Sequence, residues 1–297
     1  MTVESLKTFC DLVETGSFSR AARLNFVTQS AVSQQLRGLE RHFGVRLLDR
    51  GPRRSLQPTP AGKLVYAEAR AAVERLAALG DRLRHRPDVV AGSVTVASVY
   101  SVGLHTLPGP MKSFLRAHPQ VSLRLVYRRT DEVYRECLDG SADLGVVACP
   151  ARRAQLEVVP LRPDELVLAC PPDHGLARRA RVVSARLSGE RFIAFDRDIP
   201  TRRLVDRFLR AHGAAAAVTM ELDNIETIKR SVEAGLGVSI LPRPALENEV
   251  KAGTLVALPL AGGPLTRPLG LIHRRGRELS PAAQAFLETL RRDLGAP

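Results

Sequence analysis

The chain contains no tryptophan, only 4% aromatic residues and only four cysteines among its 297 residues. No run of about 18 apolar residues occurs, which argues against a transmembrane helix. The first residues are not a basic region followed by an apolar run, so no signal peptide is expected. The cysteines form no C-x-x-C pair and no regular framework, so we expect reduced thiols and a cytoplasmic location without membrane contact: Cys10, Cys137, Cys149 and Cys170.

Catalytic and metal-binding motifs are also missing. Neither G-x-S-x-G nor H-E-x-x-H occurs, and the seven histidines are isolated. The run Gly235-Leu236-Gly237 suggests a dinucleotide loop, but a third glycine is lacking and the run follows a predicted helix rather than a strand. We interpret it as a helix end that enters a buried strand. The sequence therefore predicts no catalytic residue, no metal site, no resident cofactor and no enzymatic activity.

The chain does have an excess of positive charge. It carries 44 Lys+Arg against 31 Asp+Glu, a formal net charge of +13, with a pI near 10.5. Such a charge favours nucleic acid, an acidic lipid surface or an anionic small molecule as a partner. Because 39 of the basic residues are arginine and only 5 are lysine, a coding bias would explain the excess equally well. The charge becomes informative only once it is localised.

The first 57 residues are predicted to form short helices. Ser17 is a candidate N-cap of the second helix, Thr28 caps a third helix that runs to about Phe43, and Gly44 is expected to end it. One face of the third helix is apolar: Val32, Leu36, Leu39 and Phe43. The opposite face carries hydroxyl, amide and guanidinium groups, which bind base edges and phosphates: Ser30, Ser33, Gln34, Arg37 and Arg41.

Local charge supports a nucleic-acid function for this face rather than a merely solvated one. Residues 28–63 contain seven Lys/Arg and two Asp/Glu, and Glu40 is the only acid between Asn25 and Arg46. Gly51-Pro52 is expected to turn a short β wing, which places three arginines beside the DNA backbone: Arg50, Arg53 and Arg54.

Residues 59–86 are predicted to form one long helix. Its apolar positions alternate in steps of four and three, which is typical of a pairing helix: Val65, Ala69, Ala72, Leu76, Leu79 and Leu83. A helix packed on its own domain would have the same spacing, so both interpretations stay open.

From residue 92 the pattern alternates between strands and helices, which predicts an α/β fold with parallel strands and crossover helices. The expected strands are 94–97, 121–126, 143–147, 191–195, 217–222 and 237–241, with helices at 101–117, 131–139, 201–212 and 224–235. Runs 156–161 and 165–170 come between the two sets, and a strand at 269–273 and a helix at 281–293 end the chain. We expect two similar lobes joined by two crossing strands.

Residues 1–63 resemble the winged helix-turn-helix of LysR-type transcriptional regulators. The stretches that carry the resemblance are Phe18-Ser19-Arg20-Ala21-Ala22, Val27 to Leu36, Leu39-Glu40, Leu47-Leu48-Asp49-Arg50 and Thr59-Pro60-Ala61-Gly62. The resemblance implies a DNA-binding domain at 1–58, a linker and dimerisation helix at 59–90, and an effector-binding domain at 91–297 similar to periplasmic binding proteins. Lobe I would comprise 91–162 and 268–297, and lobe II 163–267.

The same resemblance implies double-stranded DNA, a small-molecule co-inducer and further copies of the chain, as a dimer or tetramer, as partners, with RNA polymerase as another. The expected DNA-binding residues are Thr28, Gln29, Ser30, Ser33, Gln34, Arg37, Arg50, Arg53 and Arg54.

Effector-binding residues are expected where strands end and helices begin, because helix N-termini attract anions. These positions are Ser98, Tyr100, Ser101, Thr130, Cys149, Arg197, Thr201 and Asn224. Ser101, Thr130, Thr201 and Asn224 are also expected helix N-caps, which alone explains their type. Hydroxyls together with Arg197 favour a small anion whose identity is unknown. The stretches 195–201 and 223–229 resemble regulators of sulfur assimilation and carbon fixation.

Two other functions compete with a regulator. The lobes at 92–297 are compatible with a solute-binding or transport protein, against which the basic N-terminal domain and the missing signal peptide argue. An α/β enzyme with a helical appendage is the second, against which the absent catalytic set argues. A redox role for Cys149 is disfavoured because no resolving partner is spaced nearby.

Overall fold

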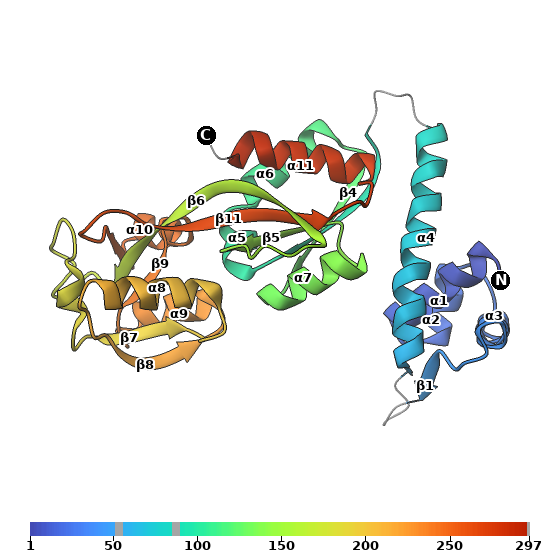
Figure 1. The fold of residues 1–297 in the computed structure, drawn as a ribbon, viewed down its shortest axis with the longest axis horizontal. Coiled ribbons are helices and arrows are strands. Elements are labelled where there is room, and N and C mark those ends of the chain that lie inside the picture. The colour runs from blue at the N-terminus through green and yellow to red at the C-terminus, as the bar shows by residue number, and fades with distance from the viewer. Residues whose placement is uncertain (51–55, 85–89, 296–297) are drawn as a thin grey trace. The chain divides into compact units, whose positions relative to one another are not determined.

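A computed structural model describes residues 1–50, 56–84 and 90–295. The chain divides into two compact units. The first is Met1–Gly92 with the short piece Asp139–Ser141, and the second is the remainder of the chain from Ser93. Both units are drawn in Figure 1.

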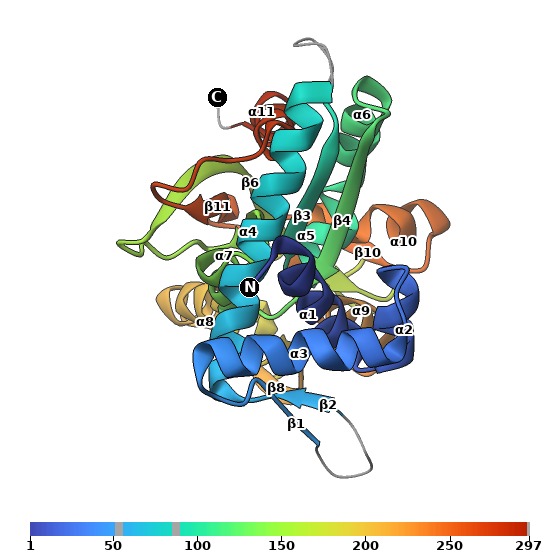
Figure 2. The ribbon, with the colours of Figure 1, turned by 90° about the vertical axis from the view of Figure 1, so that its right-hand side faces the viewer.

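The first unit opens with three helices, α1 (Val3–Thr15), α2 (Phe18–Leu24) and α3 (Gln29–Phe43). As predicted, the side chain of Ser17 caps α2 and that of Thr28 caps α3, while Gly44 ends α3 in the left-handed conformation. The helices bury a small core that fixes α3 against the other two: Phe9, Leu12, Ala21, Val32 and Leu39. In Figure 2, α3 lies across the front of this unit.

A short antiparallel pair follows, β1 (Leu48–Arg50) with β2 (Leu56–Pro58). This pair is the predicted wing, and it lies next to α3 in Figure 2. The turn of the wing, with Arg53 and Arg54, falls outside the described residues. The wing is tied to α3 by Glu40, whose carboxylate accepts a hydrogen bond from the backbone N–H of Leu47 at 2.9 Å.

Helix α4 (Pro60–Arg84) is the predicted long helix. Its first turns pack on their own unit, because Val65 joins the core around Phe9 and Ala69 is buried. Leu76, one heptad after Ala69, is 47% exposed. Packing on its own domain therefore explains the first half of the apolar seam and not Leu76, and the side chains of Leu79 and Leu83 lie outside the described residues.

The second unit alternates strands and helices as predicted. Its elements are β3 (Gly92–Ser98), α5 (Tyr100–His105), α6 (Pro108–Ala117), β4 (Val121–Tyr127), α7 (Thr130–Asp139), β5 (Leu144–Ala148), β6 (Leu156–Cys170), β7 (Arg191–Phe195), α8 (Pro200–Ala211), β8 (Ala217–Leu222), α9 (Ile225–Glu233), β9 (Ser239–Pro242), α10 (Glu247–Ala252), β10 (Val256–Leu258), β11 (Leu265–Arg274) and α11 (Pro281–Leu294). The short 3-10 helices η2 (Ser184–Leu187) and η3 (Arg243–Leu246) flank lobe II strands.

The two lobes share one mixed sheet. Its order is β10-β6-β11-β5-β3-β4, with β9 paired to β6, while β7 and β8 form a separate parallel pair. The long strands β6 and β11 run antiparallel through both lobes (Figure 1), which confirms the two predicted crossing strands. The predicted parallel pairing is present between β3 and β5 and between β7 and β8, and the crossing strand β11 pairs antiparallel with β5 and β6.

Three local predictions also need correction. The single helix predicted at 101–117 is two helices, because Pro108 begins a new one and cannot continue the ladder of α5. The runs 156–161 and 165–170 are one strand, β6. Strand β10 and helix α10 lie in a segment where no element was predicted.

Gly235 and Gly237 have the structural role expected of them. Gly235 follows α9 with a φ of +73°, and Val238 then pairs with Phe192. A Cβ on Gly237 would lie 2.3 Å from the carbonyl oxygen of Arg191. The run is therefore a helix end that enters a buried strand, as the sequence predicted.

Gly62 provides a test of how α4 docks on the wing. A Cβ at this position would lie 1.9 Å from the carbonyl oxygen of Leu47. We expect Gly62→Ala to lower the free energy of unfolding by about 1–3 kcal/mol, because backbone must move to relieve the overlap. Urea denaturation followed by circular dichroism measures it.

The matched control is Gly38→Ala in α3, where an added Cβ meets no atom within 4 Å. That substitution should raise stability by roughly 0.5–1 kcal/mol, because alanine loses less backbone entropy than glycine in a helix. Equal effects of the two substitutions would contradict the close docking of α4 on Leu47.

Candidate functional site

The solvent-facing side of α3 is built from polar side chains whose backbone is held rigidly by the core. Thr28, Gln29, Ser30, Gln34 and Arg37 are exposed, and Ser33 is partly exposed. Thr28 accepts from the backbone N–H of Ala31 at 3.2 Å and lies 2.9 Å from the Ser30 hydroxyl. The structure thus places five of the predicted DNA-binding residues on the solvent-facing side of α3 and a sixth, Thr28, at its N-cap.

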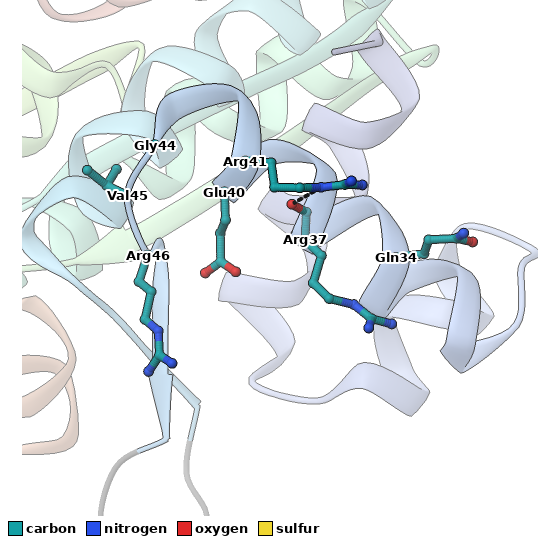
Figure 3. Close-up of a pocket in the computed structure, with 7 residues that line it drawn as sticks. All are labelled: Gln34, Arg37, Glu40, Arg41, Gly44, Val45 and Arg46. Atoms are coloured by element: carbon teal, nitrogen blue, oxygen red, sulfur yellow. Dashed lines mark hydrogen bonds between the residues drawn. The ribbon is translucent and has the colours of Figure 1, made fainter.

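A hollow of about 710 Å³ lies between the C-terminal half of α3 and the start of the wing (Figure 3). It is lined by Gln34, Arg37, Glu40, Arg41, Gly44, Val45 and Arg46. In Figure 3 the side chains of Arg37 and Arg46 point to the same side. Arg46 was not among the predicted contacts, although it follows the helix stop Gly44 and is exposed, as Arg37 is.

Glu40 is the only acid in this hollow, and its carboxylate is already used. It accepts from the backbone N–H of Leu47 at 2.9 Å and, more weakly, from that of Leu48 at 3.5 Å. The three arginines of the hollow therefore face solvent with no carboxylate partner among the described residues, which suits a phosphate backbone. Arg50 lies at the end of β1, while its side chain and residues Arg53 and Arg54 are outside the described part of the chain.

The second unit contains a cleft of about 430 Å³ between its lobes. Five of the predicted effector residues line it: Tyr100, Ser101, Thr130, Cys149 and Thr201. They come from the start of α5, the start of α7, the end of β5 and the start of α8. Strand ends and helix starts therefore converge on one space, as doubly wound topology requires.

Three other predicted residues do not line this cleft. Ser98 is fully buried, and its hydroxyl donates to the carbonyl of Val146 at 3.3 Å. Arg197 points to Glu221, with which it forms an exposed ion pair at 3.1 Å. Asn224 caps α9 by accepting from the N–H of Glu226 at 2.8 Å, as its type predicted.

The capping explanation fails for three of the hydroxyl residues. Thr130 is the first residue of α7 rather than its N-cap. The N-cap of α5 is Val99 and that of α8 is Ile199, and neither makes a side-chain cap. Ser101 and Thr201 are each the second residue of their helix, so their prediction as N-caps was wrong. Their hydroxyl oxygens instead lie near Arg267, at 3.0 and 3.5 Å from its Nη1.

Several cleft residues escaped sequence reasoning, which weighed only strand ends and helix starts. Arg128 binds Glu136, Arg153 lies 4.2 Å over the ring of Tyr134, and Arg203 lines the cleft from α8. Among the described residues, Arg153 and Arg203 have no carboxylate partner. Isolated arginines that follow a strand or lie one turn into a helix carry no motif that would have signalled them.

Arg129 joins the lobes across the cleft. Its guanidinium in lobe I lies 3.2 Å from Asp196, 2.9 Å from Asp198 and 3.5 Å from Asp223, all in lobe II. Hydrogen bonding to Asp196 is the main cause of a raised pKa of Arg129, which keeps it charged. Asp198 and Asp223 of this cluster line the same cleft as Arg153 and Arg203.

Comparison with known proteins now identifies the family. Residues 3–63 match the family model of the bacterial regulatory helix-turn-helix protein, lysR family, and residues 87–295 match the LysR substrate binding domain. The chain belongs to the LysR family of transcriptional regulators. It is thus a LysR-type regulator with an N-terminal helix-turn-helix and a C-terminal effector-binding domain.

Relatives match over almost the whole chain. The uncharacterized HTH-type transcriptional regulator YeiE of Escherichia coli is 32% identical over 97% of this chain and 96% of its own length. The RuBisCO operon transcriptional regulator of Allochromatium vinosum is 31% identical over 97% and 95%. In fold, the chain resembles full-length CbnR complexed with its target DNA, with a TM-score of 0.72 at 24% identity over 99% of this chain and 100% of that one.

The described residues contain neither a membrane span nor a metal-binding cluster. None of their helices combines the length and the apolar character needed to cross a bilayer. No group of three His, Cys, Asp or Glu side chains in the same residues is placed to hold a metal ion.

Cys149 offers a test of the cleft's chemistry. It is half-buried with a φ of +51°, and burial raises the pKa of its thiol above the ordinary value despite nearby Arg267, Arg203 and Arg207. We expect slow reaction with a disulfide reagent (DTNB) at neutral pH, with a midpoint above that of an ordinary thiol. The measurement is the DTNB rate against pH.

The control is Cys149→Ala, which should remove this reaction because Cys10, Cys137 and Cys170 are buried. Rapid reaction at pH 7 that depends on Cys149 would contradict the raised pKa and would restore the redox interpretation.

Proposed function

We propose that the exposed face of α3 reads base edges in the major groove while the wing binds the flanking phosphates. The observation that carries this proposal is the row of hydroxyl, amide and guanidinium groups from Thr28 to Arg37 on a face without an available acid. Short polar side chains let a helix enter the groove, and arginine binds guanine or phosphate. The structural neighbour CbnR, whose structure is a complex with its target DNA, supports DNA as the partner of such a domain.

Two copies of the chain, and a tetramer from two such pairs, would place paired helices on an inverted-repeat site. The exposed apolar Leu76 on α4 supports pairing through the linker helix. We assign domain bounds of 1–58, 59–90 and 91–297, with RNA polymerase as a further partner and the cytoplasm as the location. The chain acts without catalytic chemistry of its own in this proposal.

We further propose that the cleft binds a small anion. Hydroxyls at the starts of α5, α7 and α8 supply donors, and Arg153 and Arg203 supply positive charge without a carboxylate partner in the described chain. The relatives named as RuBisCO regulators support a metabolite signal. An anion that binds residues of both lobes would favour one lobe arrangement and so change how the DNA-binding units are held.

Arg37 tests the reading face. Arg37→Ala should weaken binding to DNA from upstream of the protein's own gene by about 10- to 100-fold, the cost of one arginine contact to a base. Fluorescence anisotropy with specific and scrambled duplexes measures it. The matched control is Arg116→Ala, an equal charge change at an exposed position of α6 in the other unit.

Loss of binding to both duplexes alike would assign Arg37 to phosphate rather than to a base. Binding equal to that of the wild type would contradict the assignment of this face. Adding candidate anions to the same assay tests the effector: an anion that changes anisotropy at fixed DNA supports the proposal, and a panel without effect contradicts it.

A further inference from the structure

Arg267 is the largest fully buried side chain among the described residues, and nothing in the sequence marked it. It is 1% exposed, on β11, directly opposite Asp164 of β6 in the antiparallel register. Its Nε and Nη2 donate to the same Asp164 oxygen at 3.0 and 2.7 Å. Because Asp164 is itself only 6% exposed, the pair balances its own charge inside the strand crossing.

The third nitrogen of the guanidinium is directed elsewhere. Nη1 donates to the Ser101 hydroxyl oxygen at 3.0 Å and makes a longer contact, 3.5 Å, with that of Thr201. Ser101 lies at the start of α5 in lobe I and Thr201 at the start of α8 in lobe II, and both line the cleft. One side chain on the crossing strand therefore reaches a hydroxyl of each lobe.

The chemistry of arginine determines whether the Ser101 and Thr201 hydroxyls donate or accept. Arginine only donates, so at each contact the hydroxyl oxygen must accept and its own hydrogen is left over. Within the described parts of the chain, neither hydroxyl has an acceptor for that hydrogen. Both are second residues of their helices and cap nothing, so their hydrogens are available to whatever fills the cleft.

We infer that Arg267 is a positioning residue that turns Ser101 and Thr201 into a pair of hydrogen-bond donors, one from each lobe, aimed at a ligand oxygen. The chemical class selected is a small oxyanion: sulfate, phosphate or a phosphate ester. The inference rests on the proposed function, because it assigns the recognition chemistry of the same cleft. Since Asp164 neutralises Arg267, the guanidinium contributes orientation here and the hydroxyls contribute the contact.

The test is isothermal titration of the full-length protein with sulfate, phosphate and ribose 5-phosphate, with ribose as the neutral control. Ser101→Ala and Thr201→Val should each lower the affinity for the anion by about tenfold or more, because each removes a hydrogen bond to a charged group. Thr201→Ser keeps the hydroxyl and should stay within about twofold of wild type, within the accuracy of such comparisons. None of these substitutions replaces Arg267 or Asp164, although Ser101→Ala and Thr201→Val each remove an acceptor of Arg267 Nη1.

A double-mutant cycle separates positioning from support of the fold. Arg267→Lys keeps the charge beside Asp164 but not the planar guanidinium. It should therefore lower the affinity for the anion in the wild-type background. In the Ser101→Ala/Thr201→Val background the same change should have little further effect, because Arg267 acts through those hydroxyls. An equal loss in both backgrounds overturns the inference. If Arg267→Lys fails to fold, the comparison of Thr201→Val with Thr201→Ser decides.

Equal anion binding by Thr201→Val, Ser101→Ala and wild type also overturns the inference. A wild-type protein that binds its upstream DNA but none of the three anions overturns it too, while leaving the DNA-binding proposal intact. Loss of DNA binding by the wild type would instead contradict the proposed DNA-binding function.

Discussion

The ion pair between Arg267 and Asp164 is the constraint on which the effector-binding unit depends. Two buried opposite charges are tolerated only when they form a well-aligned ion pair with hydrogen bonds. A buried charge without a partner strongly destabilises the fold. The pair therefore fixes the register of β6 against β11 where these strands pass between the lobes. The ladder shifts immediately afterwards, around Pro268, which has no N–H to donate. The helices that border the cleft are placed by this crossing.

In the DNA-binding unit, too, a single acidic side chain holds two parts of the structure together. Glu40 is the only acid between Asn25 and Arg46, and its carboxylate accepts a hydrogen bond from the backbone N–H of Leu47 at the start of the wing. Thr59 reinforces this junction, since its hydroxyl donates to the carbonyl of Arg46 at 2.8 Å. The position of the wing relative to α3 is thus set by hydrogen bonds within the domain, which leaves Arg37 and Arg46 for an external partner.

Sequence reasoning succeeded where the cause is local. Caps at Ser17 and Thr28, the stop at Gly44 and the order of strands and helices all follow from nearby residues. It failed where a distant residue decides: Ser101 and Thr201 have the type of N-caps but accept from Arg267, which is 166 and 66 positions away. No spacing rule connects such positions, because the strand crossing creates the contact.

The arginines fall into two groups: those at sites that require a guanidinium, and those at sites where lysine would serve equally well. At Arg267, Nε and Nη2 both donate to one Asp164 oxygen while Nη1 donates to the Ser101 hydroxyl, a planar fork that a lysine ammonium on a flexible stem does not reproduce. Arg129 likewise contacts carboxylates through two different nitrogens. Exposed positions such as Arg178 and Arg179 have no described side-chain partner, so lysine would serve there as well. The structure therefore does not select arginine over lysine at such surface positions, whereas at Arg267 the geometry itself requires a guanidinium.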